Sequence, residues 1–78
     1  MNNPANESLS FSFQLKSNQQ VEVKVIDLTG RVQMRQTLTG SQGNNYINMQ
    51  LAPALQNGMY IIDVTAGAEH FTAKFIKQ

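Results

Sequence analysis

Apolar and polar residues alternate strictly near the start of the chain. Leucine or phenylalanine occupies every second position of residues 9–15, and serine or glutamine fills the positions between them. A period of two places all apolar side chains on one face of an extended strand and all polar ones on the other. The pattern therefore predicts a strand over residues 8–15 with one buried face.

The same period returns several times further along the chain. Residues 59–62 are instead apolar on both faces, which is typical of a central strand. Gln36 interrupts the alternation of residues 31–38, so this strand is predicted to lie at an edge or to contain a β-bulge. The alternating apolar positions are Val21, Val23 and Val25, then Val32 and Met34, then Ile47, Met49 and Leu51, and finally Phe71, Ala73 and Phe75.

Turn-forming residues separate these segments, and no apolar pattern has the helical period of 3.6. The sequence predicts six strands roughly 10 residues apart, with a seventh short strand over residues 52–55. This spacing favours an all-β, immunoglobulin-like antiparallel sandwich of about seven strands, with a small oligonucleotide-binding-type barrel as the alternative. Residues 1–7 are expected to be a linker edge, and residues 8–78 a single domain.

Composition narrows the functions open to such a domain. The chain has 78 residues and a net charge of +1, from six Lys and Arg against five Asp and Glu. Nucleic-acid binders concentrate positive charge, so no DNA or RNA partner is expected. The absence of cysteine excludes disulfides, thiolate catalysis and cysteine-zinc sites. No apolar run approaches the length of a membrane-spanning helix.

Catalytic and metal-binding patterns are also missing from the sequence. His70 is the only histidine, no serine lies in a Gly-x-Ser-x-Gly turn, and the acidic residues are scattered singly. His70 with Glu69 supplies too few ligands for zinc, and Asp27 and Asp63 are too isolated for a calcium loop. We therefore expect no enzyme activity, no metal and no cofactor. His70 is placed on the wet face of the last strand, and Gly40 and Gly43 are interpreted as ordinary loop glycines.

Four short motifs follow one another along the chain. They are Asn3-Pro4, Asp27-Leu28-Thr29-Gly30-Arg31, Leu55-Gln56-Asn57-Gly58-Met59-Tyr60 and Lys74-Phe75-Ile76-Lys77. Together they resemble the type A C-terminal sorting domain of cargo proteins of the Bacteroidetes type IX (Por) secretion system. That family shows Asn-Pro, Asp-x-x-Gly-Lys/Arg, Leu-x-x-Gly-x-Tyr and a Lys-apolar-apolar-Lys ending in the same order.

The resemblance implies a non-catalytic secretion signal with a seven-stranded immunoglobulin-like fold. Such a domain follows a passenger, crosses the periplasm with it, and is bound by shuttle proteins and the outer-membrane translocon. A sortase-type cysteine peptidase then removes the domain, here before or near Asn3, and attaches the passenger to anionic lipopolysaccharide at the cell surface or releases it. The residues that carry the motifs and the expected recognition are Asn3, Pro4, Asp27, Gly30, Arg31, Leu55, Gly58, Tyr60, Lys74 and Lys77.

Physical roles are expected for several of these residues. Asp27 would accept hydrogen bonds from the amides of its turn, and Gly30 and Gly58 would adopt turn conformations closed to other residues. Tyr60 would pack with its hydroxyl hydrogen-bonded. Lys74 and Lys77 fit either signalling or protection of an edge strand against aggregation.

Two other functional classes stay open from the sequence. One is an uncleaved accessory sandwich for adhesion or carbohydrate binding, with Tyr46 and Tyr60 as the candidate contact residues. The other is an assembly module of the secretion machinery itself. An exposed edge strand also offers a route to an edge-strand dimer.

Overall fold

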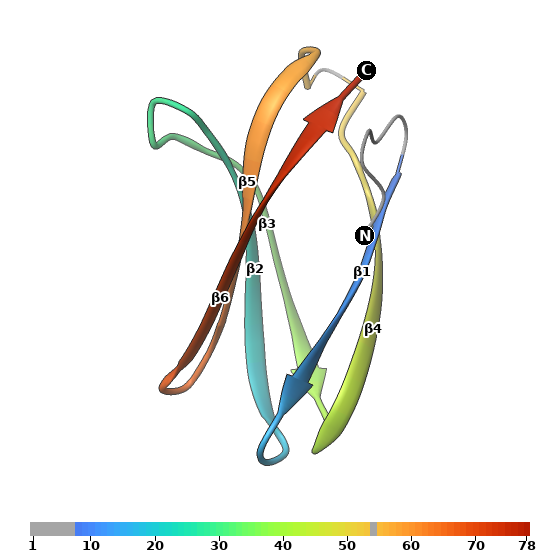
Figure 1. The fold of residues 1–78 in the computed structure, drawn as a ribbon, viewed down its shortest axis with the longest axis vertical. Coiled ribbons are helices and arrows are strands. Elements are labelled where there is room, and N and C mark those ends of the chain that lie inside the picture. The colour runs from blue at the N-terminus through green and yellow to red at the C-terminus, as the bar shows by residue number, and fades with distance from the viewer. Residues whose placement is uncertain (1–7, 54) are drawn as a thin grey trace.

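The structure is a computed structural model that describes residues 8–53 and 55–78. These residues form two antiparallel sheets that face each other as the layers of a sandwich (Figure 1). The strands are β1 (Ser8–Leu15), β2 (Gln19–Asp27), β3 (Val32–Gly40), β4 (Gly43–Gln50), β5 (Gly58–Ala66) and β6 (Glu69–Lys77).

The two sheets differ in width. β1 pairs with β4 in a two-stranded sheet, and the order in the other sheet is β3-β2-β5-β6. β5 is central, as its apolar residues on both faces predicted. The prediction of an antiparallel sandwich is confirmed, with six strands in the described residues in place of about seven. The expected short strand over residues 52–55 is instead a turn in which the amide of Leu55 bonds to the carbonyl of Ala52 at 3.0 Å, and Ala54 lies outside the described residues.

The core lies between the inner faces of the sheets, as the alternation predicts. Every second residue of β1 is buried, and Val21, Val23 and Val25 of β2 are fully enclosed. The rings of Phe75 and Tyr60 stack with their centroids 5.7 Å apart. Phe71 is on the same face of β6 as Phe75 but is less buried than the alternation predicts, because 38% of its surface is exposed.

β3 is an edge strand and contains a bulge, but the irregularity is not at Gln36. Val25 of β2 faces Met34 and Ile26 faces Val32, which leaves Gln33 as the extra residue. The extra residue places Val32 on the outer face and Met34 against the core. The prediction that these two residues share a face is therefore wrong. The bulge also brings the Gln33 amide within 2.8 Å of the Asp27 carboxylate, to which it donates a hydrogen bond.

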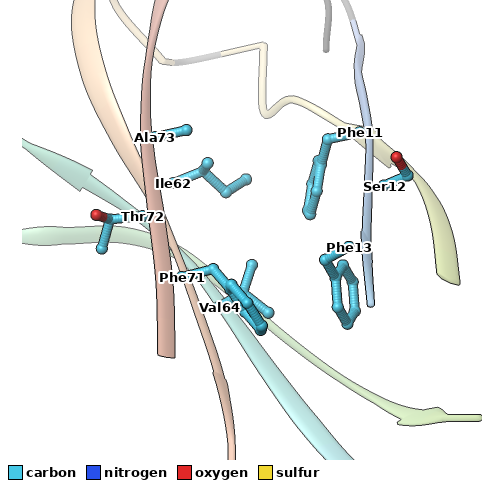
Figure 2. Close-up of a pocket in the computed structure, with 8 residues that line it drawn as sticks. All are labelled: Phe11, Ser12, Phe13, Ile62, Val64, Phe71, Thr72 and Ala73. Atoms are coloured by element: carbon cyan, nitrogen blue, oxygen red, sulfur yellow. The ribbon is translucent and has the colours of Figure 1, made fainter. Parts of the chain in front are cut away.

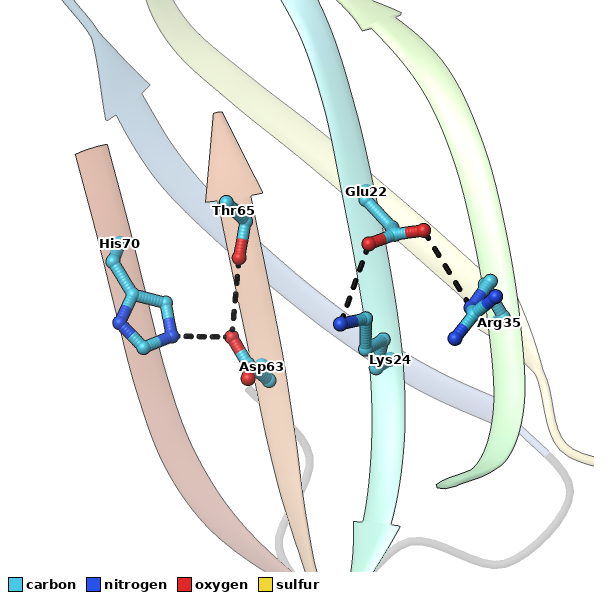
Figure 3. Close-up of polar contacts among 6 residues, drawn as sticks. All are labelled: Glu22, Lys24, Arg35, Asp63, Thr65 and His70. Atoms are coloured by element: carbon cyan, nitrogen blue, oxygen red, sulfur yellow. Dashed lines mark hydrogen bonds and ion pairs between the residues drawn. The ribbon is translucent and has the colours of Figure 1, made fainter. Parts of the chain in front are cut away.

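The outer face of the larger sheet has a polar half. Glu22 lies 3.4 Å from the Lys24 ammonium and 3.5 Å from the Arg35 guanidinium (Figure 3). Asp63 bonds to His70 on the neighbouring strand, and His70 is exposed as predicted. Ion pairs at a partly exposed surface contribute little to stability.

Candidate functional site

Three of the sequence motifs meet at one end of the sandwich. The β2–β3 turn, the start of β5 and the end of β6 all lie at the end of the molecule shown at the top of Figure 1. β5 pairs with β2 on one side and with β6 on the other, so the sheet itself brings together segments that are distant in sequence. This motif end comprises residues 27–33, 55–60 and 74–77.

Asp27 organises the β2–β3 turn. Its Oδ1 accepts hydrogen bonds from the amide of Thr29 at 2.9 Å, the hydroxyl of Thr29 at 2.6 Å and the amide of Arg31 at 3.0 Å. Gly30 closes the turn with a φ of 90°, a conformation that favours glycine. The predicted role of Asp27 as a turn former is confirmed.

These donors favour the charged form of the carboxylate. The hydroxyl of Thr29 and the amide of Arg31, followed by Gln33, lower the pKa of Asp27 from 3.8 to about 2. Because the pKa is lower in the folded chain than in the unfolded one, the ionised carboxylate stabilises the fold above about pH 4, and this stabilisation is lost as pH falls towards 2.

Asp27→Asn should remove this pH dependence while it keeps an oxygen for the two backbone amides. We expect the difference in unfolding free energy between the wild type and Asp27→Asn to be largest above about pH 5 and to shrink as pH falls to about 2.5. Urea titrations at both pH values, followed by circular dichroism, give that difference. An unchanged difference across this range would contradict the role given to the carboxylate.

The segment before β5 is tied to the sheet by Tyr60. The hydroxyl of Tyr60 donates to the carbonyl of Gln56 at 2.5 Å, and the side chain of Leu55 is buried. Gly58 has a φ of 150°, which again favours glycine. The expected hydrogen bond of Tyr60 is confirmed. Gly58 has the backbone that favours glycine, as expected, but it is the first residue of β5 and does not lie in a turn. These residues fix the shape of this end from inside.

The two lysines of the last motif lie on different faces of β6. Lys77 is paired with Gly58 and is half-buried, whereas Lys74 is paired with Ile61 and is exposed on the outer face. Within the motif end, the structure therefore places Lys77 beside the start of β5 and Lys74 beside the apolar part of the outer face. They do not form a single basic cluster.

A shallow hollow of about 450 Å³ lies at the motif end. The exposed Arg31 contributes to its wall, while the charge of Asp27 is held in the turn. Side chains from both the β2–β3 turn and the start of β5 line the hollow, among them Asp27, Leu28, Arg31, Gln33, Gln56 and Tyr60.

An outer apolar patch adjoins this hollow. On the outer face Ile26 pairs with Val32 on one side and Ile61 on the other, and Met59 pairs with Ile76. Leu28, in the turn, is 64% exposed and shares the hollow with Met59. Contiguous exposed apolar surface marks sites of protein contact. The large exposed members of the patch are Leu28, Val32, Met59 and Ile76.

Sequence reasoning did not identify this patch. Leu28 lies between Asp27 and Thr29 in a turn, and Val32 was expected to face the core. The sequence does contain a signal for the outer apolar patch. Large apolar residues occupy positions that alternate with the core positions of β2, β5 and β6. Asn3 and Pro4 belong to the first motif and lie outside the described residues.

In the described part of the chain, the polar contacts of Asp63 do not have the order of a catalytic triad. Asp63 accepts from both Thr65 and His70, so the carboxylate lies between the hydroxyl and the imidazole (Figure 3). In a Ser-His-Asp triad, by contrast, the imidazole lies between the nucleophilic hydroxyl and the carboxylate. Within residues 8–53 and 55–78, no three His, Cys, Asp or Glu residues gather as a metal site would require. The same residues contain no helix with the length and apolar character to cross a bilayer.

Comparison with known proteins identifies one family. No curated protein and no solved structure matches the chain significantly. The family model of the secretion system C-terminal sorting domain matches residues 3–78, which include all four motifs. The chain therefore belongs to the secretion system C-terminal sorting domains, a family of non-catalytic type IX secretion signals carried by exported proteins.

Proposed function

We propose that the motif end and the outer apolar patch form the surface by which the type IX machinery recognises this domain. The observation that carries the proposal is the meeting of residues 27–31, 55–60 and 74–77 at one end of the sandwich. Asp27, Gly30, Gly58 and Tyr60 hold the shape, while Leu28, Arg31 and Lys74 are exposed to a partner.

The chemistry of this surface indicates the chemistry of its partner. Arg31, Lys74 and Lys77 are cationic, and the nearby Asp27 is already bonded to its own turn. An apolar patch with a cationic rim fits an apolar protein surface that carries carboxylates. We assign this complementary surface to the translocon or to a shuttle protein that delivers cargo to it.

Export of a fused reporter tests the proposal. The chain is fused to the C-terminus of a periplasmically targeted fluorescent protein in a host with type IX machinery. We expect Arg31→Glu and Leu28→Asp each to lower fluorescence at the cell surface or in the medium by about tenfold, because central contacts dominate an interface. Lys16→Glu is the matched control. Lys16 is exposed in the connection between β1 and β2, which lies at the opposite end of the sandwich (Figure 1), so the export of this variant should equal that of the wild type.

Two outcomes would contradict this assignment. Equal export of Arg31→Glu, Leu28→Asp and Lys16→Glu would remove the motif end from recognition. Periplasmic retention of the folded wild-type fusion would favour the accessory adhesion or assembly-module functions. Circular dichroism of each purified variant of the chain, without the fluorescent protein, shows whether a loss of export comes from a loss of folding.

The fate of the domain after export is part of the same proposal. We place removal by the sortase before or near Asn3, with transfer of the passenger to anionic lipopolysaccharide at the outer membrane. The resemblance of the four motifs to type A cargo supports this step. The mass of the exported reporter gives the position of the cut, and an exported reporter that keeps the whole domain would contradict the step.

A further inference from the structure

A groove of about 280 Å³ opens along the side of the sandwich where β1 faces β6 (Figure 2). The side chains of Ser12 and Thr72 point away from it, so these two residues border the groove with their main chain. Apolar side chains form the rest of the lining, namely Phe11 and Phe13 from β1, Ile62 and Val64 from β5, and Phe71 and Ala73 from β6.

The groove exists because a two-stranded sheet packs against a four-stranded sheet. Neighbouring strands are about 4.8 Å apart, so the larger sheet projects beyond the smaller one by roughly one strand on each side. On the β3 side, the chain after β4 covers the gap, where the amide of Ala52 lies 3.4 Å from the sulfur of Met34. On the β6 side, no described segment covers Phe71, whose ring centroid lies 6.0 Å from that of Phe13.

β1 borders the groove with an unpaired edge. Within the described residues β1 pairs with β4 alone, so its other edge presents free amides and carbonyls on alternate residues. Edge strands are usually protected by charge, proline or a bulge. β3 has Arg35 and a bulge and β6 has Lys74, whereas β1 contains only serine, leucine, phenylalanine and glutamine. β4 is also uncharged, but it does not line this groove.

We infer that this groove binds an extended, uncharged segment of a partner protein. The segment pairs with the free edge of β1 as a third strand of the smaller sheet and places alternate apolar side chains against Phe11, Phe13 and Phe71. Two features select this occupant. The gap is one strand wide, and a charge on the inward face of the segment would be buried without a partner. The site lies apart from the motif end, so the inference does not depend on the proposed recognition surface.

A second copy of the chain fits this groove less well. Two β1 strands that paired antiparallel in one sheet would place both larger sheets on the same side. Because each larger sheet projects beyond its own β1, the two β6 strands would collide. A single extended segment brings no second sheet with it, and so avoids the collision.

Peptide binding to the whole chain tests the inference. The probe is a blocked peptide of alternating threonine and valine, about eight residues long, the usual length of a strand. Titrated into the ¹⁵N-labelled chain, it should shift the amide signals of residues 10–14 and 71–73 saturably. Phe71→Lys should weaken binding by about tenfold or more, because the new charge faces the groove. A matched peptide with lysine in place of valine should not bind.

Tyr46→Lys is the matched control variant, since Tyr46 is 71% exposed on β4 and does not line the groove. It should bind the threonine-valine peptide as tightly as the wild type. If the spectrum of Phe71→Lys shows misfolding, Phe71→Ala replaces it and should still weaken binding by about threefold. Equal affinity of the Phe71 and Tyr46 variants, shifts confined to the edge of β3, or a mass that shows dimers filling the groove would each overturn the inference.

Discussion

Phe75→Ala is expected to leave most of the chain unfolded at room temperature. The side chain of Phe75 is 0% exposed and its ring stacks on Tyr60. Truncation of a buried phenylalanine costs about 3–5 kcal/mol. A core of this size with no disulfide supplies roughly 3–5 kcal/mol in total, so the substitution removes nearly all of it. Urea unfolding followed by circular dichroism, with the dispersion of the NMR spectrum, measures the loss.

Lys74→Ala in the same strand is the control for that experiment. Lys74 is exposed on the outer face, so its truncation should change the free energy of unfolding by no more than about 0.5 kcal/mol. A cooperative transition for Phe75→Ala near the wild-type midpoint would show that this aromatic contact does not hold β6 in the sandwich.

The burial of Phe75 also decides how the last strand can be tested as a signal. A deletion of residues 74–78 removes Phe75 together with Lys74 and Lys77, so it destroys the fold along with any signal. Loss of export after such a deletion therefore has two explanations. Single substitutions at exposed positions, as proposed for Arg31 and Leu28, separate recognition from folding.

The strands could be predicted from the sequence because each has one face towards the core. The period of two located the buried residues of β1 and β2 correctly, and the apolar run at 59–62 identified the central strand. The turn at Asp27 was also predictable. A short polar side chain bonds to amides only two and four residues away, so the interaction is encoded locally.

Features that depend on distant segments were not predictable in this way. Alternation shows which face of β6 points inward, but not that the opposite sheet ends before it reaches Phe71. The bulge at Gln33 likewise follows from pairing with β2, whereas the pattern pointed to Gln36. The meeting of the motifs at one end needs β5 between β2 and β6, an order of strands that no local pattern contains.

Gly40 illustrates the same limit in a single residue. The stretch Gly40-Ser41-Gln42-Gly43-Asn44 has the composition of a loop, and both glycines were interpreted as loop residues. In the structure both lie in strands instead: Gly43 is the first residue of β4, and Gly40 is the last residue of β3 and is buried. A methyl group at its Cα would lie 2.5 Å from Cδ1 of Leu15 and 2.8 Å from Cγ2 of Val21. A side chain at residue 40 would therefore force Leu15 and Val21 to shift, which favours glycine at this position.

Gly40→Val should therefore destabilise the chain by overpacking. Forcing extra carbons into a close-packed core costs about 1–3 kcal/mol, which is a large share of the stability of so small a domain. Ser41→Val is the matched control, because the neighbouring Ser41 is exposed and offers space for the same side chain. The urea midpoint should fall for Gly40→Val and stay near the wild-type value for Ser41→Val. Equal midpoints for the two variants would mean that Leu15 and Val21 can move aside, and that the end of β3 is packed more loosely than its burial indicates.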